Sequence, residues 1–331
     1  MGRTLRGVAA ALVTLTIVVA PVAAHAAAPT DRQRAARAVA FLASKQKANG
    51  AIVAFSPVGS TADAVVAFVA AGVGRTKMSK AVGYLRSQVE AGRVDSVGLQ
   101  AKVVLAVSAA GLDPRTFGGA NLIKALRDTV SGGHFGTSAV FDDAMALLAL
   151  ESAGVAPSLS TANWLLAAQC PDGGWAYDEP YDGATDDASC YDGTPTDYFS
   201  SDSNTTSYVV QALTNISKTD WVADPFGFFP TVRDHAKGWG YSAGFTTDAN
   251  STALVLQAYA EAGLPIPTGG MSALRRLQYP VCGAFAYTST GGAKTDPDVG
   301  ATIGAVPGLL RATLPVSGSV RTGLPAVRVC A

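Results

Sequence analysis

The stretch DSNTTSYVVQA (residues 202–212) recurs 46 residues later as DANSTALVLQA (residues 248–258), with six of eleven positions identical. Each copy opens with an Asp, a residue that accepts hydrogen bonds from the first N–H groups of a helix. Each then passes into an apolar run, YVVQAL or ALVLQAY. A helix that recurs at a fixed interval is the signature of a repeat architecture.

Glycines divide the rest of the chain in the same way. The segments FVAAGV, VSAAGL, LESAGV and YAEAGL, which end at residues 73, 112, 155 and 264, each close an apolar run with a Gly. Gly is the usual residue at a left-handed helix C-terminus. The pattern predicts six units over residues 31–74, 75–113, 114–156, 157–218, 219–265 and 266–312, with an Asp-rich insertion at 176–202 in the fourth.

Each unit contains two kinds of helix. The first is amphipathic, as in TDRQRAARAVAFLAS (30–44), and the second is apolar on nearly every side, as in ADAVVAFVAAG (62–72). A helix with one polar face lies on a surface, whereas one that is apolar all round is enclosed. The sequence therefore predicts an all-α fold, an (α/α)6 toroid in which an outer ring of six helices encloses an inner ring of six.

The N-terminal residues indicate export. Arg3 and Arg6 precede an apolar run from Val8 to about Val22, and the small-residue pattern Ala24-His25-Ala26 follows. These features are typical of a secretory signal peptide, which we predict over residues 1–28. The toroid would then occupy residues 29–312 and a C-terminal tail residues 313–331. We expect a secreted or cell-surface protein with no membrane span after signal cleavage.

The overall charge limits the class of partner that the chain can bind. The chain has 25 basic and 25 acidic residues, so it offers no basic excess for nucleic acid. We expect a small molecule or a protein as partner instead.

The four cysteines allow three pairings; we favour a local Cys170–Cys190 bridge and a Cys282–Cys330 bridge that pins the tail.

One motif resembles a known family. WLLAAQCPDGGW (164–175) is similar to the QW repeat of the terpenoid cyclase and protein prenyltransferase superfamily, through Gln169, Gly173 and Trp175. Weaker copies lie at Gln278, Gly283 and Phe285 and around Gln46, Gly50 and Ile52. The resemblance implies the same toroid, with ligands near the mouth of the inner ring. Two helices, DDAMALLALESAG and DANSTALVLQAYAEAG, look most like those of the secreted cobalamin carriers, transcobalamin and intrinsic factor, which implies cobalamin as a ligand.

Catalysis stays open at the level of sequence. The class II cyclases that the chain resembles carry a D-x-D-D acid motif. The nearest candidates here are the pair Asp142 and Asp143 and, in the insertion, the pair Asp186 and Asp187, and neither pair completes the motif. Paired carboxylates can share a proton, but Asp at a helix start also caps the helix. Asp248 is a third candidate acid. The zinc site of the prenyltransferases needs Asp, Cys and His together, which His134 and His235 do not provide in this pattern.

Further candidates lie on the apolar helices and in the insertion. Gln211 and Gln257 would face the central cavity or satisfy neighbouring backbone groups. Three aromatic residues are candidates for stacking on a ligand or for wedging between repeats: Tyr208, Trp239 and Tyr241. The acidic insertion predicts either a solvated loop or a Ca²⁺ site, for which the candidate ligands are Asp182, Asp186 and Asp187.

These observations give one main functional hypothesis and two alternatives. The main hypothesis is non-catalytic binding of a small molecule or of a protein partner, because the scaffold carries no recognisable catalytic constellation. The first alternative is an enzyme of the cyclase or prenyltransferase type that acts on an isoprenoid or lipid-like substrate. The second is a structural surface module.

Overall fold

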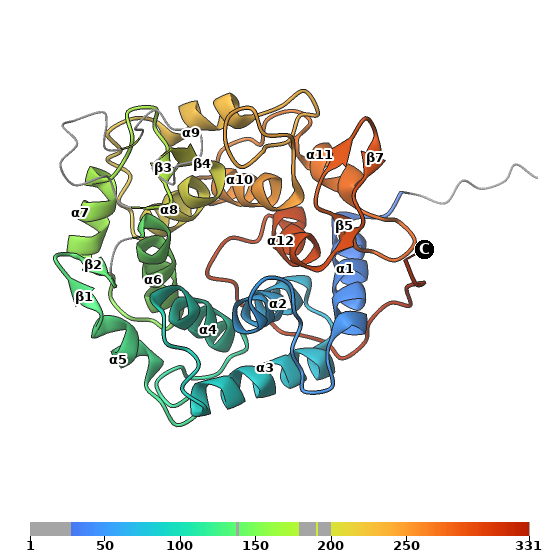
Figure 1. Cartoon of the computed structure of the whole chain (residues 1–331), viewed down its shortest axis with the longest axis horizontal. Helices are drawn as coiled ribbons and strands as arrows, with labels where there is room; N and C mark the ends of the chain where they lie inside the picture. The colour runs from blue at the N-terminus through green and yellow to red at the C-terminus, as the bar shows by residue number, and fades with distance from the viewer. Residues whose placement is uncertain (1–27, 137–138, 179–189, 191–199, 331) are drawn as a thin grey trace, which may run out of the picture.

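The computed structural model describes residues 28–136, 139–178, 190 and 200–330. Within these residues the helices form two concentric rings (Figure 1). Each helix of the inner ring packs against the next, and the last packs against the first, which closes the ring. The inner helices are α2 (Pro57–Ala71), α4 (Val97–Ala109), α6 (Val140–Ser152), α8 (Ser203–Asn215), α10 (Ala249–Glu261) and α12 (Val299–Leu310).

The outer ring alternates with the inner one along the chain (Figure 1). Its helices are α1 (Asp31–Lys45), α3 (Arg75–Glu90), α5 (Leu122–Arg127), α7 (Leu159–Ala167), α9 (Pro225–Phe228) and α11 (Gly270–Leu277), with a short 3₁₀ helix, Phe229–Val232, directly after α9. The prediction of an all-α toroid with an enclosed inner ring is confirmed. The unit boundaries remain predictions, and the proposed signal peptide lies almost wholly outside the described residues.

Short antiparallel ladders occupy the turns. They pair β1 (Val130–Ser131) with β2 (His134–Phe135), β3 (Trp175–Ala176) with β4 (Ser201–Asp202), β5 (Phe285–Ala286) with β8 (Pro297–Asp298), and β6 (Ser289–Thr290) with β7 (Ala293–Lys294). In two of them a large aromatic residue lies opposite the Asp that caps the next inner helix: Trp175 opposite Asp202, and Phe285 opposite Asp298. The ladders thus set each aromatic residue beside the start of an inner helix.

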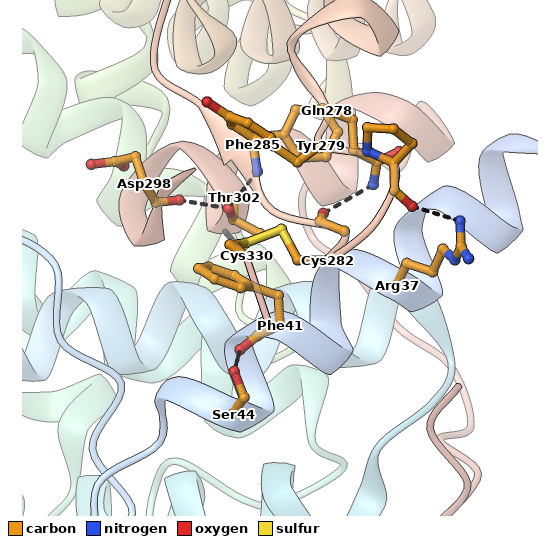
Figure 2. Close-up of a disulfide and its surroundings, with 12 residues drawn as sticks. Arg37, Phe41, Ser44, Gln278, Tyr279, Cys282, Phe285, Asp298, Thr302 and Cys330 are labelled. Carbon is orange, nitrogen blue, oxygen red and sulfur yellow. Dashed lines mark hydrogen bonds between the residues drawn. A yellow bond between two sulfur atoms is a disulfide. The ribbon is translucent and has the colours of Figure 1, made fainter. Parts of the chain in front are cut away.

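The buried aromatic residues of these turns are wedges fixed by a recurring hydrogen bond. Trp175, Trp239 and Phe285 are fully buried. Their backbone N–H groups donate to threonine hydroxyls in the first turn of the following inner helix: Thr206 at 2.9 Å, Thr252 at 3.0 Å and Thr302 at 2.8 Å. Figure 2 shows the bond between Phe285 and Thr302. The Ile52 N–H makes the equivalent bond to Thr61 at 3.0 Å.

The glutamines of the QW-like motifs join neighbouring units. The Gln169 amide donates to Gly173 O at 2.9 Å in its own turn and to Ala223 O at 2.7 Å just before α9. Gln278 repeats this with Gly283 O at 3.0 Å and Arg34 O at 2.9 Å on α1. Each glutamine side chain therefore links its own turn to the next outer helix or the residues just before it through two hydrogen bonds. The QW-like motif is thus part of the scaffold.

Two disulfides complete the fold, and both predicted pairings are confirmed. Cys170 bonds to Cys190, and Cys282 bonds to Cys330. The second bridge holds the end of the tail against the turn between α11 and α12, close to Phe41 of α1 (Figure 2). No helix in the described part of the chain has both the length and the apolar character that a membrane span needs.

Candidate ligand cavity

The inner ring surrounds a cavity of about 290 Å³, to which all six inner helices contribute. This volume is at the lower end of the range for small-molecule sites, roughly 300–1,000 Å³. Most of the lining is apolar: Val66, Leu105, Phe141, Met145, Leu254, Ile303, Pro307 and Leu314. Phe55, which lines the entrance, is 86% exposed.

The inner helices are parallel, which fixes the orientation of the cavity. The N-terminal residues of α6, α8 and α10 each donate a backbone hydrogen bond to the turn before the next inner helix, from Phe141 to Tyr177, from Ser203 to Tyr241 and from Ala249 to Tyr287. The helix starts therefore share one rim, where Phe55 lies. The tail residue Leu314 lies at the opposite end of the cavity.

An ion pair lies inside this apolar cavity. Lys102 Nζ of α4 is 2.7 Å from Asp63 Oδ2 of α2, and the two side chains are 23% and 37% exposed. Burial lowers the pKa of the Lys102 ammonium, but the charge and hydrogen bond of Asp63, together with Tyr208 and Tyr177, raise it overall to about 12. Lys102 is therefore protonated at physiological pH. It offers hydrogen-bond donors and a charge rather than a nucleophilic amine.

Tyr208 adds a neutral hydroxyl to the same centre. Burial raises the pKa of Tyr208 to about 12, even though the nearby Lys102 ammonium lowers it. The ring of Tyr208 meets that of Phe141 edge-on, with centroids 5.3 Å apart. The predicted ligand candidate Tyr208 thus lines the cavity beside the Asp63–Lys102 ion pair, and we call these three residues the polar centre.

The structure separates the two adjacent carboxylates of α6. Asp143 is fully buried, and its Oδ1 accepts the Phe135 N–H at 2.5 Å, the role that threonine plays in α2, α8, α10 and α12. Asp142 is half-buried and packs closely on Gly98, one helical turn before Lys102 on α4. Burial raises the pKa of Asp142, and the Lys102 charge partly opposes the rise. Of the two, Asp142 is the carboxyl close to the polar centre.

The other predicted residues lie in several places. Gln257 lines the cavity, and its amide donates to Ala253 O at 3.1 Å. Gln211 is fully buried and accepts the Leu314 N–H at 3.0 Å, so it serves the tail. Trp239 is a buried wedge with the Arg233 guanidinium over its ring, and Tyr241 is half-buried outside the cavity lining.

None of the three candidate acids, Asp142, Asp143 and Asp248, is part of the cavity lining, although Asp142 lies near Lys102. Asp248 caps α10, accepting the Ser251 N–H at 2.8 Å, and burial raises its pKa to about 6. The proposed Ca²⁺ ligands, Asp182, Asp186 and Asp187, lie outside the described residues. Among the residues that are described, no group of three His, Cys, Asp or Glu side chains is arranged to hold a metal ion.

Sequence reasoning missed two members of the polar centre, Asp63 and Lys102. The sequence did contain an indication of this site, because each of the two is a charged residue in the middle of an otherwise apolar helix that the pattern assigns to the inner ring. A charge at such a position faces either a partner or a cavity. The two residues are 39 positions apart in the sequence, and this separation concealed their pairing.

Comparison with known proteins identifies the fold. Neither protein-family models nor curated protein sequences match the chain. Among solved structures, a protein from Actinoplanes is similar with 16% identity and a TM-score of 0.56, covering 85% of this chain and 99% of that one. The type II terpene cyclase MstE from Scytonema, solved with geranylgeranyl dihydroxybenzoate, has 12% identity and a TM-score of 0.57, with 85% and 97% covered.

A glycosidase solved with glucose is also similar, with 13% identity, a TM-score of 0.50, and 86% and 98% of the two chains covered. At such identities the likeness shows the fold. Proteins with different substrates share it, so activity has to be argued from the cavity. The solved structures support the toroid fold that the resemblance implies and give no support to the cobalamin-carrier branch.

Proposed function

We propose that this chain is a cyclase-like enzyme that takes a small isoprenoid or other lipid-like molecule into its central cavity. The observation that carries the proposal is the composition of the cavity: apolar side chains from five of the six inner helices lie around the polar centre, and a second set of polar residues also lines the cavity, namely Ser60, Asn204, Asn250 and Gln257. Apolar walls favour a hydrocarbon chain, and a few convergent polar groups orient the ligand. The fold likeness to a type II terpene cyclase supports the same substrate class.

In this proposal Asp142 is the proton donor. Burial raises the pKa of this carboxyl, which is the direction of shift that general acids show, and the carboxyl lies beside the cavity lining, near Lys102. Its proton passes to one carbon of a substrate double bond, and the positive charge appears on the other carbon. Because the Lys102 ammonium already neutralises Asp63, the newly ionised Asp142 carboxylate is the group that stabilises this charge. A second double bond of the same chain attacks the charged carbon and closes a ring, and the resulting cation loses a proton to the Asp142 carboxylate, which restores the acid.

The test separates catalysis from binding. Purified protein is incubated with farnesol and geranylgeraniol, products are sought by gas chromatography with mass spectrometry, and bound ligand is measured by native mass spectrometry. We expect Asp142→Asn to abolish turnover and to retain binding. Asp95→Asn, which changes an exposed carboxylate, is the matched control and should retain both.

Each outcome decides between the functions. Binding without turnover in the unaltered protein would support the non-catalytic carrier and overturn the enzyme. If neither alcohol binds or reacts, the lipid-like ligand is wrong. Cobalamin is included as a third probe because the sequence predicts it, and Ca²⁺ as a fourth because the acidic insertion predicts it.

We also propose that the protein is exported. The two disulfides support this, because such bridges persist in oxidising compartments. Cell fractionation followed by N-terminal sequencing tests the proposal. A mature N-terminus near residue 28 in the extracellular fraction would agree with it, and an intact Met1 in the cytosolic fraction would contradict it.

A further inference from the structure

The C-terminal tail contributes one residue, Leu314, to the cavity lining, at the end where the inner helices finish. Leu314 is 8% exposed and lines the cavity. Its backbone is held on both sides by α8: its N–H donates to Gln211 Oε1 at 3.0 Å, and its carbonyl accepts from Asn215 Nδ2 at 2.6 Å. The Leu314 side chain is therefore presented to the cavity by hydrogen bonds that do not depend on its own size.

Leu314 lies just beyond the polar centre. Gln211, which holds it, follows Tyr208 on α8 by three residues, so the floor lies roughly one helical turn, about 5 Å, deeper than the Tyr208 level. The same spacing places Val66, three residues after Asp63, and Leu105, three residues after Lys102, at this depth, together with the amide of Gln257, the counterpart of Gln211. An apolar ligand whose polar group rests at the polar centre thus directs its inner end at the Leu314 side chain.

The tail beyond Leu314 is fixed, so the floor does not yield. Arg321 pairs with Val73 in a parallel bridge and donates its N–H to Gly72 O at 3.0 Å. Arg75 Nε donates to Val320 O at 2.7 Å. The Cys282–Cys330 disulfide anchors the end of the tail. A ligand too long for the cavity therefore meets a packed side chain on a braced backbone, and forcing extra methylenes into such a site is unfavourable.

We propose that Leu314 sets the length of the hydrocarbon chain that the cavity accepts beyond the polar centre. The inference rests on the lipid-like ligand of the proposed function and adds a specificity-determining residue to it. Truncating Leu314 lengthens the inner end of the cavity, and enlarging it shortens that end. Neither change touches the Asp63–Lys102 ion pair.

The experiment measures the affinity of a series of straight-chain primary alcohols, from hexanol to hexadecanol, by native mass spectrometry and calorimetry. We expect affinity to rise with chain length to a limit and then to fall. In Leu314→Ala the limit should move longer by about two to three methylene groups, the size of the side chain removed. For the alcohol just beyond the original limit, affinity should increase about tenfold. In Leu314→Trp the limit should move shorter.

Val316→Ala is the matched control, because Val316 is buried in the same tail and is not part of the cavity lining. It should leave the length limit unchanged. Leu314→Val provides a milder truncation with a smaller shift, should the Ala variant fail to fold. Binding with the same limit in Leu314→Ala, Leu314→Val and Leu314→Trp overturns this inference alone. No binding of any alcohol to the unaltered protein overturns the lipid-like ligand and this inference with it.

Discussion

Gly173 of the QW-like motif lies where two units touch. Its φ is +90°, and a Cβ placed on it would be 2.5 Å from the backbone oxygen of Asp224, just before α9. Glycine is needed here for two reasons, the left-handed backbone and the close approach of a neighbouring chain segment. Gly50 and Gly283 make the same approach to backbone oxygens of Lys80 and Arg37.

We expect Gly173→Ala to lower the free energy of unfolding by more than about 2 kcal/mol, because strain and a backbone clash add. Gly244→Ala is the matched control: its φ is +84°, but no atom lies within 4 Å of the added Cβ, so only the strain of about 1 kcal/mol remains. Urea unfolding followed by circular dichroism measures both. Equal losses in the two variants would refute the role of the Asp224 contact.

The adjacent residues Asp142 and Asp143 should separate function from stability. Asp143→Ala leaves the buried Phe135 N–H without its Asp143 acceptor and should cost about 1–3 kcal/mol of unfolding free energy. Asp143→Asn keeps an acceptor oxygen and should cost less. Asp142→Ala should change stability little and abolish turnover. Denaturant unfolding and product analysis on all three variants test this, and a stability loss in Asp142→Ala as large as in Asp143→Ala would contradict it.

The sequence singled out Asp142 and Asp143 but could not show which of them has the structural role and which is the candidate acid. Both residues are Asp at a helix start, and helix capping and acid catalysis draw on the same residue type. Successive helical residues point about 100° apart. Which one faces the Phe135 turn and which faces Gly98 depends on how α6 is rotated against α4, and that rotation follows from packing around the whole ring.

At the scale of the helix, α8 and α10 begin with buried carboxylates. Asp202 accepts the N–H groups of Asn204 and Thr205 at 2.8 and 2.7 Å, and Asp248 accepts that of Ser251 at 2.8 Å. Burial raises the pKa of each to about 6, although these hydrogen bonds favour the charged form. The caps that start the two matched helices are therefore sensitive to pH.

The sign of the effect follows from proton binding. An unfolded Asp has a pKa of about 3.9, so between about pH 4 and pH 6 the folded state binds more protons than the unfolded one. Stability should therefore decrease as pH rises through this window. Asp248→Asn removes one of the two titrating groups, keeps a capping side chain, and should reduce the slope and raise stability at pH 7 by about 1–3 kcal/mol.

Denaturant unfolding at several pH values between 4 and 8 measures the slope. Asp298→Asn alters the corresponding cap of α12, where the side chain is only half-buried, and serves as the matched control. A slope that persists unchanged in the Asp202→Asn, Asp248→Asn double variant would show that other groups produce it.

Elements differed in how well the sequence predicted them. The inner helices were recognisable because enclosure on all sides requires apolar residues on all sides. The two-residue ladders were not predicted, because a strand such as β3 is defined by a partner, β4, that lies across the insertion. The Asp63–Lys102 pair escaped prediction for a related reason: only the packing of α2 on α4 brings the two charges together.

On the scale of the whole molecule, the first and last units meet and close the ring. Arg275 of α11 makes a bidentate pair with Asp31 of α1 at 2.7 and 2.6 Å. Arg37 Nη1 of α1 donates to Pro280 O at 2.8 Å (Figure 2). The count of six helix pairs in the sequence was enough to predict a closed ring. The contacts that join the first unit to the last, however, connect residues more than 240 positions apart.

The Cys282–Cys330 disulfide should contribute to the unfolding free energy of the whole molecule. Cys282 and Cys330 are 48 residues apart, and Cys170 and Cys190 are 20 apart. If each bridge acts by restricting the unfolded chain, replacing both cysteines of a pair by serine should cost about 4 kcal/mol for the first and about 3 kcal/mol for the second. Thermal and denaturant unfolding of the two double variants measure these losses.

The alcohol length limit should stay unchanged without Cys282–Cys330, because α8 and the Val73–Arg321 bridge still hold Leu314 in place. A limit that shifts when this disulfide is removed would show that the covalent bond, not those contacts, fixes the cavity floor.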